Sequence, residues 1–377
     1  MVTLFAVVGF ASANLVTAAE EVVEAGRVIV VKPNATVQLF EGEPKPVTQA
    51  RVLTYSRRNG QWLWVDELWG WIDQDEVLSL EDAEKAFTEA IEKAAAADKV
   101  DPRALHSRGV VRLELGKQKE ALADFDAVLD ANVKVPGVLL NRGLALLELG
   151  EFDDAVDAMT AAIAADPADG RPYDARSRAL LQREFFDAAL SDSEKAVELS
   201  PREPVHWHNL GQIQIARGKF EAAVRSFNEA ITLSPRFVEA LGSRGYCLKK
   251  LGRLTAAADD YRRAIKIDPR LATPHNDLAW LLATTPDESV RDAEEAVKEA
   301  EEAVRIAEAE EEAGRPNPLL GQYVDTLAAA YAAAEQWEAA EKAGRRAVEL
   351  LEGADEYAAD QRLTRYLQKK PYVEPKP

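Results

Sequence analysis

Apolar residues recur at helical spacing through the middle of the chain, in blocks that repeat every 34 residues. The blocks that begin at Pro136, Gly170, Pro204 and Val238 follow one another without a gap. Each block carries a small residue at its eighth position, and these residues are Gly143, Ser177, Gly211 and Gly245. A fixed period of this length indicates a repeat architecture, in which one structural unit is stacked on the next.

The apolar positions of each block predict two amphipathic helices, separated by a turn at Gly150, Gly218 or Gly252. A proline closes the second helix of every block, at Pro167, Pro201, Pro235 and Pro269. One helix pair cannot bury its apolar face alone, so its stability has to come from contacts with neighbouring pairs. We therefore expect the pairs to form a curved solenoid with one concave surface.

The blocks resemble tetratricopeptide repeats (TPR), because small, alanine, proline and bulky residues occupy matching places. The bulky residues include Trp207, Phe227, Leu241 and Tyr261. Weaker units begin at Pro102, Ala272 and Gly321, which brings the count to seven. A lone helix over residues 82–96 precedes these units, and a capping helix is expected near residues 357–367.

Between Gly26 and Leu78 the period changes to that of β-strands. Five short runs rich in β-branched and aromatic residues predict five strands and a small barrel, and they cover Val28–Val31, Thr36–Phe40, Gln49–Tyr55, Gln61–Val65 and Gly70–Ile72. The segments Asn59–Val65 and Trp69–Ile72 are similar to the closing strands of bacterial SH3-like domains. If Leu63 and Val65 point inward, Trp62 and Trp64 point outward.

Two interpretations of Trp62 and Trp64 remain open at this stage. These side chains either pack on the first solenoid helix near Phe87 or on Tyr55, or they form an aromatic platform for a peptide or glycan, with Arg51, Arg57 and Arg58 nearby. The predicted layout is a signal peptide over 1–19, an SH3-like β-barrel over 20–80, an incomplete repeat helix over 81–101, seven TPR units over 102–354 and a capping helix with a tail over 355–377.

A signal peptide is the interpretation of the apolar run Leu4–Val16, because it is too short to span a bilayer and small residues follow it. Cleavage is expected after Ala18 or Ala19. We accordingly expect an exported bacterial protein of the periplasm or cell envelope. The alternative is a mis-assigned start or an uncleaved buried helix, because no lysine or arginine precedes the run.

The formal net charge of -19 argues against nucleic acid as a partner, because phosphates would be repelled rather than neutralised. Residues 287–314 hold twelve carboxylates, which form either a solvated helix face or an acidic docking site. The single cysteine, Cys247, excludes an internal disulfide and is expected to be a small buried residue rather than a reactive thiol.

No catalytic motif is present in the sequence. His206 and His208 are two residues apart on one predicted helix and face different directions, so they cannot form a two-ligand metal pair there. We therefore predict no enzyme activity, no cofactor and no metal site. An enzyme remains open only if carboxylates converge in a pocket.

Arg108, Arg176 and Arg244 occupy the same place in their units, and Asp124, Asp192 and Asp260 follow each of them by sixteen residues. Because these places lie on adjoining helices, we expect an ion pair across each helix pair. Leu210 has Ser226 in place of the aspartate, whereas Arg142 is an exception that is matched by Ala158.

The resemblance to TPR proteins implies a protein or peptide partner, bound on outward places of each unit's first helix. Carried onto this sequence, those places are Asn141, Arg178, His208, Asn209, Gln212, Tyr246, Lys249, Asn276 and Trp280. Val205 and Leu140 stand where the family's clamp for carboxyl-terminal peptides needs polar residues, so that mode of binding is not expected. The first hypothesis is thus a non-enzymatic interaction scaffold. The alternative is a cell-wall or glycan-binding module that acts through the SH3-like domain.

Overall fold

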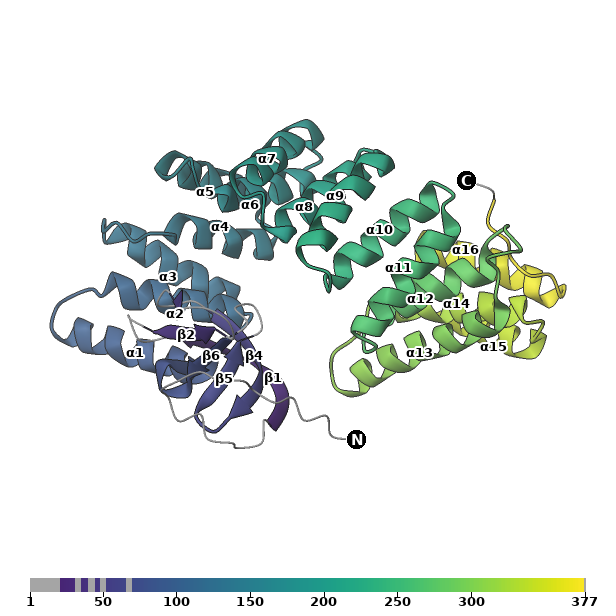
Figure 1. The fold of residues 1–377 in the computed structure, drawn as a ribbon, viewed down its shortest axis with the longest axis horizontal. Coiled ribbons are helices and arrows are strands. Elements are labelled where there is room, and N and C mark those ends of the chain that lie inside the picture. The colour runs from purple at the N-terminus through teal and green to yellow at the C-terminus, as the bar shows by residue number, and fades with distance from the viewer. Residues whose placement is uncertain (1–20, 31–34, 40–44, 48–51, 66–69, 376–377) are drawn as a thin grey trace, which may run out of the picture. The chain divides into compact units, whose positions relative to one another are not determined.

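The computed structural model describes residues 21–30, 35–39, 45–47, 52–65 and 70–375. Two compact units divide the chain, residues 1–162 and 163–377, and each is described by itself (Figure 1). The predicted signal peptide lies outside the described residues, as do Arg51 and Trp69. Among the helices of the described residues, none combines the length and the apolar composition needed to cross a membrane.

The first unit begins with an antiparallel sheet in the strand order β3-β2-β6-β5-β4-β1-β7. Its strands are β1 (Glu21–Val30), β2 (Thr36–Leu39), β3 (Lys45–Pro46), β4 (Val52–Asn59), β5 (Trp62–Val65), β6 (Gly70–Asp73) and β7 (Val77–Ser79). The five predicted runs correspond to β1, β2, β4, β5 and β6. The short strands β3 and β7 are additional.

The expectation of a closed barrel is wrong. Among the described strands, β3 and β7 form the two edges of the sheet, and no pairing joins them. The physical reason lies in the edge strands. β3 is two residues long and ends in Pro46, which has no backbone N–H to donate. β7 ends at Ser79, whose hydroxyl caps the helix that follows, so the chain leaves the sheet there.

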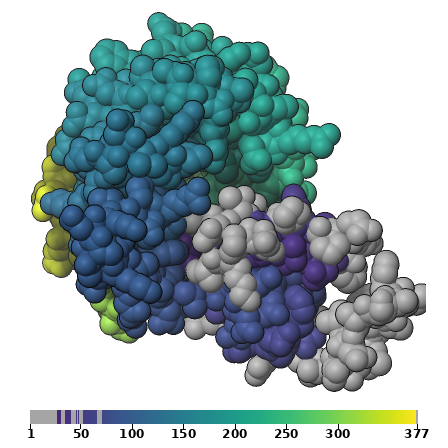
Figure 2. All heavy atoms as spheres, turned by 90° about the vertical axis from the view of Figure 1, so that its left-hand side faces the viewer, coloured from purple at the N-terminus to yellow at the C-terminus, as the bar shows by residue number. Residues whose placement is uncertain are grey.

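The sheet buries apolar side chains on both faces. Val28, Val30, Leu53 and Leu63 lie in the core of one face. Ile29 points to the opposite face and packs with Leu80, Ala83 and Val111 of the helices that follow. Arg27 forms an ion pair with Glu114. Figure 2 shows the sheet residues in dark blue and purple beside these helices in lighter blue. The sheet therefore packs against the first helices of its own unit.

Consecutive helices form hairpins throughout the rest of the described chain (Figure 1). The first unit holds α1 (Leu80–Ala96), α2 (Pro102–Glu114), α3 (Gln118–Asp130), α4 (Val138–Leu149) and most of α5 (Phe152–Ala165). The second unit holds α6 (Gly170–Gln182), α7 (Phe186–Leu199), α8 (Pro204–Ala216), α9 (Phe220–Leu233), α10 (Val238–Lys250), α11 (Leu254–Ile267), α12 (Ala272–Thr284), α13 (Ala293–Glu312), α14 (Leu320–Ala333), α15 (Trp337–Leu350) and α16 (Gly353–Leu367). The expected helix hairpins are confirmed.

Glycines end the first helix of several hairpins in a left-handed conformation. Gly150, Gly218 and Gly252 have φ values of 79°, 69° and 72°. Residues with a side chain adopt this region at a steric cost, which is why glycine is favoured at the position after a helix. The second helices α5, α7, α9 and α11 each end two residues before the predicted proline.

Glycines of another kind allow the two helices of a hairpin to approach closely. A Cβ atom built on Gly211 would lie 2.6 Å from the ring of Phe227, and one on Gly245 would lie 2.6 Å from Tyr261. Both rings are buried, so they cannot move away without disturbing the core. The hairpin of α6 and α7 has Ser177 and Ser193 at the corresponding places, both fully buried. Where the glycine is replaced, the ring is absent.

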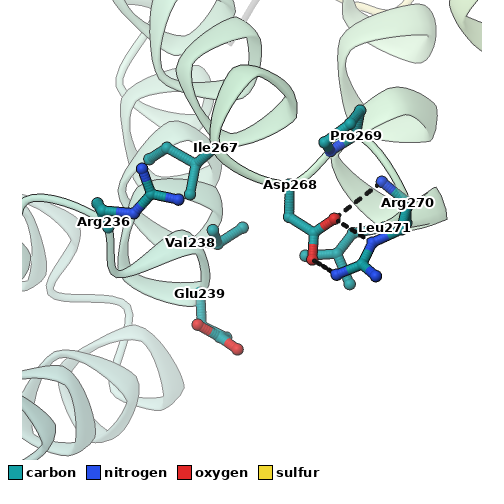
Figure 3. A pocket seen from close by; sticks show the side chains of 8 residues that line it. All are labelled: Arg236, Val238, Glu239, Ile267, Asp268, Pro269, Arg270 and Leu271. Carbon is teal, nitrogen blue, oxygen red and sulfur yellow. Dashed lines mark hydrogen bonds and ion pairs between the residues drawn. The ribbon is translucent and has the colours of Figure 1, made fainter. Parts of the chain in front are cut away.

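A small hollow lies at the turns between α9 and α10 and between α11 and α12 (Figure 3). It is lined by Arg236, Val238, Glu239, Ile267, Asp268, Pro269, Arg270 and Leu271. Its carboxylate is already engaged, because Asp268 accepts hydrogen bonds from the backbone N–H of Arg270 at 3.0 Å and from its guanidinium at 3.1 Å. These bonds hold the pKa of Asp268 below its usual range. We assign no chemistry to this hollow.

All three expected arginine–aspartate pairs are present. The Nε and Nη2 atoms of Arg176 lie 2.7 and 2.8 Å from the carboxylate of Asp192, and the Arg244 to Asp260 distances are 2.8 and 2.5 Å. Arg108 and Asp124 form the corresponding pair at 3.0 and 2.6 Å. Two parallel hydrogen bonds of this kind fix both the distance and the orientation of the paired helices.

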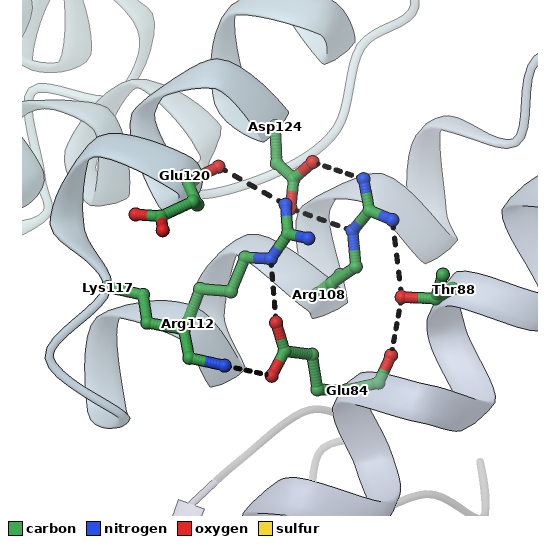
Figure 4. Close-up of polar contacts among 7 residues, drawn as sticks. All are labelled: Glu84, Thr88, Arg108, Arg112, Lys117, Glu120 and Asp124. Atoms are coloured by element: carbon green, nitrogen blue, oxygen red, sulfur yellow. Dashed lines mark hydrogen bonds and ion pairs between the residues drawn. The ribbon is translucent and has the colours of Figure 1, made fainter.

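The pair in the first unit belongs to a larger network (Figure 4). Asp124 also accepts from Arg112 at 2.8 Å, and Arg112 in turn donates to Glu84 of α1 at 3.1 Å. Lys117 contacts the other oxygen of Glu84 at 2.6 Å, and its hydrogen bond lowers the pKa of that carboxyl group. The network thus links α1, α2 and α3.

Arg142, at the equivalent place of the unit that begins at Pro136, departs from this pattern of arginine–aspartate pairs. Arg142, which has Ala158 at the matching place of its own hairpin, contacts Asp126 of the preceding hairpin at 2.7 Å. Arg244 likewise reaches back to Asn228 at 2.7 Å while it pairs with Asp260. An arginine at this place can therefore connect two successive hairpins.

We expect Gly211→Ala to lower the free energy of unfolding by about 1–3 kcal/mol, because the added methyl group overpacks the contact with Phe227. Gly242→Ala in α10 is the matched control, since a Cβ atom there meets nothing within 4 Å. That change should stabilise the protein by up to about 1 kcal/mol through helix propensity alone. Urea unfolding followed by circular dichroism measures both. Equal effects of the two changes would contradict the packing argument.

Arg176→Leu should destabilise the protein by about 2–4 kcal/mol, because the buried Asp192 loses its partner. The double variant Arg176→Leu/Asp192→Ser should recover most of this loss, since the next hairpin carries Leu210 and Ser226 at these places. As a control, Arg345→Leu breaks the exposed pair with Glu341 and should change stability by less than about 1 kcal/mol. A double variant no more stable than Arg176→Leu would argue against the pair.

Candidate binding face on the first helices of the second unit

The first helices of successive hairpins in the second unit, α6, α8, α10 and α12, carry eight of the nine predicted contact residues. We call the surface formed by these residues the groove face. On each of these helices the small and apolar side chains pack against the second helix of the same hairpin. The remaining positions face either the neighbouring first helix or solvent. The structure separates the predicted residues into these two groups.

Hydrogen bonds between neighbouring first helices engage the first group. The amide nitrogen of Asn209 on α8 donates to both carboxylate oxygens of Asp174 on α6, at 3.0 and 2.9 Å. Gln212 contacts Nε2 of His208 at 3.1 Å and Oγ of Ser243 on α10 at 2.9 Å. These bonds form a polar ladder from α6 to α10, so its members contribute to the alignment of the hairpins.

Burial shifts the pKa values of two residues in this ladder, Asp174 and His208. Burial raises the pKa of Asp174, although the hydrogen bond from Asn209 acts in the opposite direction. Burial also lowers the pKa of His208, which therefore favours the neutral imidazole at neutral pH. His208 packs against the rings of Phe227 and Phe237, with centroids 5.6 and 5.1 Å away. The ladder is therefore a desolvated structural element that connects neighbouring first helices.

The second group is directed away from the helix stack. Arg178 is exposed, and Tyr246 has 39% of its surface exposed. Lys250 lies over the ring of Tyr246, with its Nζ atom 5.4 Å from the ring centroid. Arg178 thus presents an exposed cation and Tyr246 an amphipathic aromatic side chain, which are the kinds of group that contribute most to protein interfaces.

Lys249 and Trp280 are half-buried, and both contact the end of the chain. The indole Nε1 of Trp280 donates to Oε1 of Glu374 at 2.7 Å, and Nζ of Lys249 lies 3.4 Å from the same oxygen. The two residues come from α10 and α12, so the carboxylate lies over the boundary between two hairpins. Figure 1 shows the C-terminal tail passing close to these helices.

Asn276 and Asp277 lie side by side on α12. The Oδ1 atom of Asn276 is buried and has no hydrogen-bond partner among the described residues. Its amide nitrogen lies 3.4 Å from Asp277. Burial raises the pKa of Asp277 to about 6, and the nearby charge of Lys249 opposes that shift.

Asn141, the ninth predicted residue, belongs to α4 in the first unit. Its amide nitrogen lies 3.0 Å from Nε2 of His106 on α2. The separation of 35 residues is the same as that between Asp174 and Asn209. The same type of contact between first helices therefore occurs in each unit.

The two tryptophans proposed as a barrel platform differ in exposure. Trp64 has only 8% of its surface exposed, because it packs edge-on against Trp71 with ring centroids 5.3 Å apart and lies beneath Arg57. Trp62 is half-buried. The helix-facing residues of the sheet are Ile29, Val52 and Leu78 rather than these tryptophans. Whether Trp62 and Trp64 bind a ligand stays a prediction.

Most of the acidic segment 287–314 lies in the long helix α13, and many of its carboxylates have partners in the second unit. Glu295 pairs with Arg262 at 2.6 Å, and Glu308 pairs with Arg346 at 2.7 Å. Glu299 is buried, and its hydrogen bond with His275 lowers its pKa to about 2. Cys247 is fully buried in the core, where burial raises its pKa to about 12, so no thiolate is available near neutral pH.

The enzyme alternative depends on carboxylates that converge in a pocket. Three aspartates have raised pKa values, and each has a neutral or cationic partner: Asp174 has Asn209, Asp277 has Asn276, and Asp325 has Arg362 at 2.7 Å. In the part of the chain that the structure describes, no group of three or more acidic, histidine or cysteine side chains could hold a metal ion.

Sequence reasoning missed several residues of this face. Asp174, Ser243 and Asp277 were not singled out, although the 35-residue spacing of Asp174 and Asn209 is visible in the sequence. The largest omission is the tail, where Tyr372 and Glu374 follow the capping helix. Their position on the groove face depends on the three-dimensional path of the chain, which periodicity does not encode.

The family model for tetratricopeptide repeats matches residues 79–136, 106–170, 140–204 and 208–272. These overlapping matches span more than half of the chain. The chain therefore belongs to the tetratricopeptide repeat family. No curated protein matches it.

Several solved structures are similar to parts of this chain at low sequence identity. The APC/C hetero-tetramer Cut9–Hcn1 has a chain with 16% identity and a TM-score of 0.53, over 65% of this chain and 46% of that chain. TTC0263, a thermophilic TPR protein of Thermus thermophilus, has 23% identity and a TM-score of 0.43, over 48% and 99%. YrrB, described as a TPR protein with an unusual peptide-binding site, has 20% identity and a TM-score of 0.39, over 48% and 91%. The likeness to Cut9–Hcn1 concerns the fold alone.

Asp277→Asn should stabilise this TPR protein at pH 7.5 by up to about 3 kcal/mol and should flatten its stability profile between about pH 4 and 6. The folded-state pKa of about 6 lies above the unfolded value, so the folded state binds the proton more tightly. The contribution of Asp277 to stability is therefore complete below about pH 4 and is lost as the pH rises through 6.

Urea unfolding at a series of pH values measures this difference. Asp360→Asn, at an exposed position on α16, is the control and should change stability by less than about 0.5 kcal/mol. If Asp277→Asn and the parent protein had parallel profiles across this pH range, the assignment would be wrong.

Proposed function

We propose that this TPR protein is a non-enzymatic interaction scaffold whose groove face binds an extended segment of a protein or peptide partner. One observation carries the proposal: Lys249, Trp280 and a backbone carbonyl of α12 already hold an extended segment of the chain itself. A surface that orients donors toward an extended backbone and its side chain has the features of a peptide-binding site.

The polar ladder supports the proposal by giving the face a fixed shape. Asn209 and Gln212 connect neighbouring first helices, so a partner would meet an arrangement that is already ordered. Preorganisation of this kind reduces the entropy lost on binding. Arg178 and Tyr246, which are exposed on the same face, extend the surface beyond the part that the tail covers.

The sheet is the alternative location of the function. The burial of Trp64 against Trp71 leaves Trp62 as the more accessible of the two proposed platform residues. Stacking of a sugar or a peptide side chain needs an open ring face. We therefore prefer the groove face. The net charge of -19 favours a protein partner over nucleic acid.

Selection of peptides from a random displayed library against the intact protein tests this proposal. The selected peptides should lose at least about tenfold in affinity for Arg178→Ala/Tyr246→Ala, because these residues offer the exposed charge and aromatic contact. The matched control is Arg225→Ala/Tyr357→Ala, which alters an exposed arginine and an exposed tyrosine on α9 and α16.

Fluorescence anisotropy with labelled peptides gives the dissociation constants. Unchanged binding to the Arg178/Tyr246 variant, or an equal loss with the control variant, would place the binding surface elsewhere. Both variants change exposed side chains only, and circular dichroism verifies that they remain folded.

A further inference from the structure

The final described residues, 371–375, lie on the groove face outside any helix or strand, after α16 ends at Leu367. Their side chains alternate in exposure. Tyr372 and Glu374 are half-buried against the face, whereas Pro371, Val373 and Pro375 are exposed. Alternation with a period of two is the pattern of an extended strand that contacts a surface on one side. Tyr372 and Glu374 are thus the tail side chains that contact the groove face.

Tyr372 lies in an aromatic and cationic corner. Its ring centroid is 5.8 Å from that of Trp280. The guanidinium of Arg362 on α16 lies 5.7 Å from the centroid of Tyr372 and 5.5 Å from that of Trp280. Arg362 is itself held by hydrogen bonds to Asp325, with distances of 3.1 and 2.7 Å. The corner is therefore in place before any aromatic side chain enters it.

Glu374 is recognised through its side chain and its backbone. Its Oε1 atom accepts hydrogen bonds from Trp280 at 2.7 Å and from Lys249 at 3.4 Å, while its backbone N–H donates to the carbonyl oxygen of Thr284 at 2.7 Å. Thr284 is the last residue of α12, where carbonyl groups lack partners within the helix. The carboxylate and the backbone are thus bound by groups that the fold leaves available.

These contacts are specific but few, and the side chain of Glu374 remains 29% exposed. Arg365 holds the start of the tail through the carbonyl oxygen of Pro371, at 3.3 and 3.1 Å. The prolines at 371 and 375 favour an extended backbone, which lowers the entropy lost on docking. A short tethered segment has an effective concentration on the order of millimolar, so even weak contacts keep it bound for much of the time.

We propose that residues 371–375 are an internal ligand of the groove face, and that its partner is an extended segment with an aromatic side chain followed two residues later by a carboxylate. Such a partner would make the contacts that Tyr372 and Glu374 make in the tail. It therefore binds only when the tail leaves the groove face. The inference rests on the proposed function and adds to it the chemistry of the partner and a competing segment. The tail therefore sets a threshold of affinity that a partner has to exceed.

A labelled peptide with the sequence of residues 369–375 tests the inference by fluorescence anisotropy on the full chain. Tyr372→Ala/Glu374→Gln should bind this peptide about tenfold more tightly than the parent protein, because its own tail no longer competes. Val373→Ser is the matched tail control, since that side chain is exposed, and it should leave the affinity at the parent value.

Changes in the receiving residues complete the test in the Tyr372→Ala/Glu374→Gln background. Trp280→Phe keeps a ring but removes the N–H donor and should weaken peptide binding by about tenfold. Lys249→Met should also weaken it, whereas Lys250→Met, at the neighbouring exposed position, should not. Replacing the peptide's glutamate by glutamine should have an effect similar to Trp280→Phe. All variants are verified by circular dichroism.

Equal peptide affinities of the parent and the Tyr372→Ala/Glu374→Gln variant would overturn the inference, as would indifference to the peptide's glutamate. Sedimentation tests one further alternative. A parent protein that is dimeric, with a monomeric tail variant, would show that the tail docks on a second copy and would overturn the intramolecular contact. If library peptides still depend on Arg178 and Tyr246 while the tail peptide does not bind, this inference fails and the proposed function stands.

Discussion

The close approach of the two helices in each hairpin is the contact on which the remaining structure depends. Where Gly211 faces Phe227, the absence of a Cβ atom lets a large ring fill the space between helices. This packing fixes the separation of the two helices. At that separation the arginine on the first helix reaches the aspartate on the second. Hairpins of a constant shape present the same positions of their first helices in every repeat. The groove face exists because these positions recur.

Much of the helical architecture could be predicted because repetition amplifies weak signals. A glycine before an aromatic residue sixteen places later carries little information once, but the same pair at Gly109, Gly211 and Gly245 indicates a packing rule. The ion pairs were predictable for the same reason, since Arg176 and Asp192 keep the spacing of Arg244 and Asp260. The sheet has no such repetition. Its strands could be recognised, but its openness depends on two short edge strands that carry almost no pattern.

The candidate site was predictable only in part, because equivalent positions on a repeat have different neighbours. Asn209 and Tyr246 both lie on first helices, yet Asn209 contacts Asp174 whereas Tyr246 is exposed. Which of these occurs is decided by the residue on the adjacent helix, and not by the position itself. The contact of Glu374 with Lys249 joins residues 125 positions apart, and no local pattern connects them.

The hairpin of α6 and α7 differs from its neighbours in a way that affects the cooperativity of the array. Ser193 replaces the aromatic ring there, and its buried hydroxyl has no hydrogen-bond partner among the described residues. In an array of repeats each hairpin is stabilised partly by the packing between its own two helices, so a hairpin with a serine in place of the central ring is a natural boundary between cooperative blocks. Amide hydrogens of this hairpin should consequently exchange with solvent sooner than those of α8 to α11, so opening of the array would begin at an internal repeat rather than only at its ends.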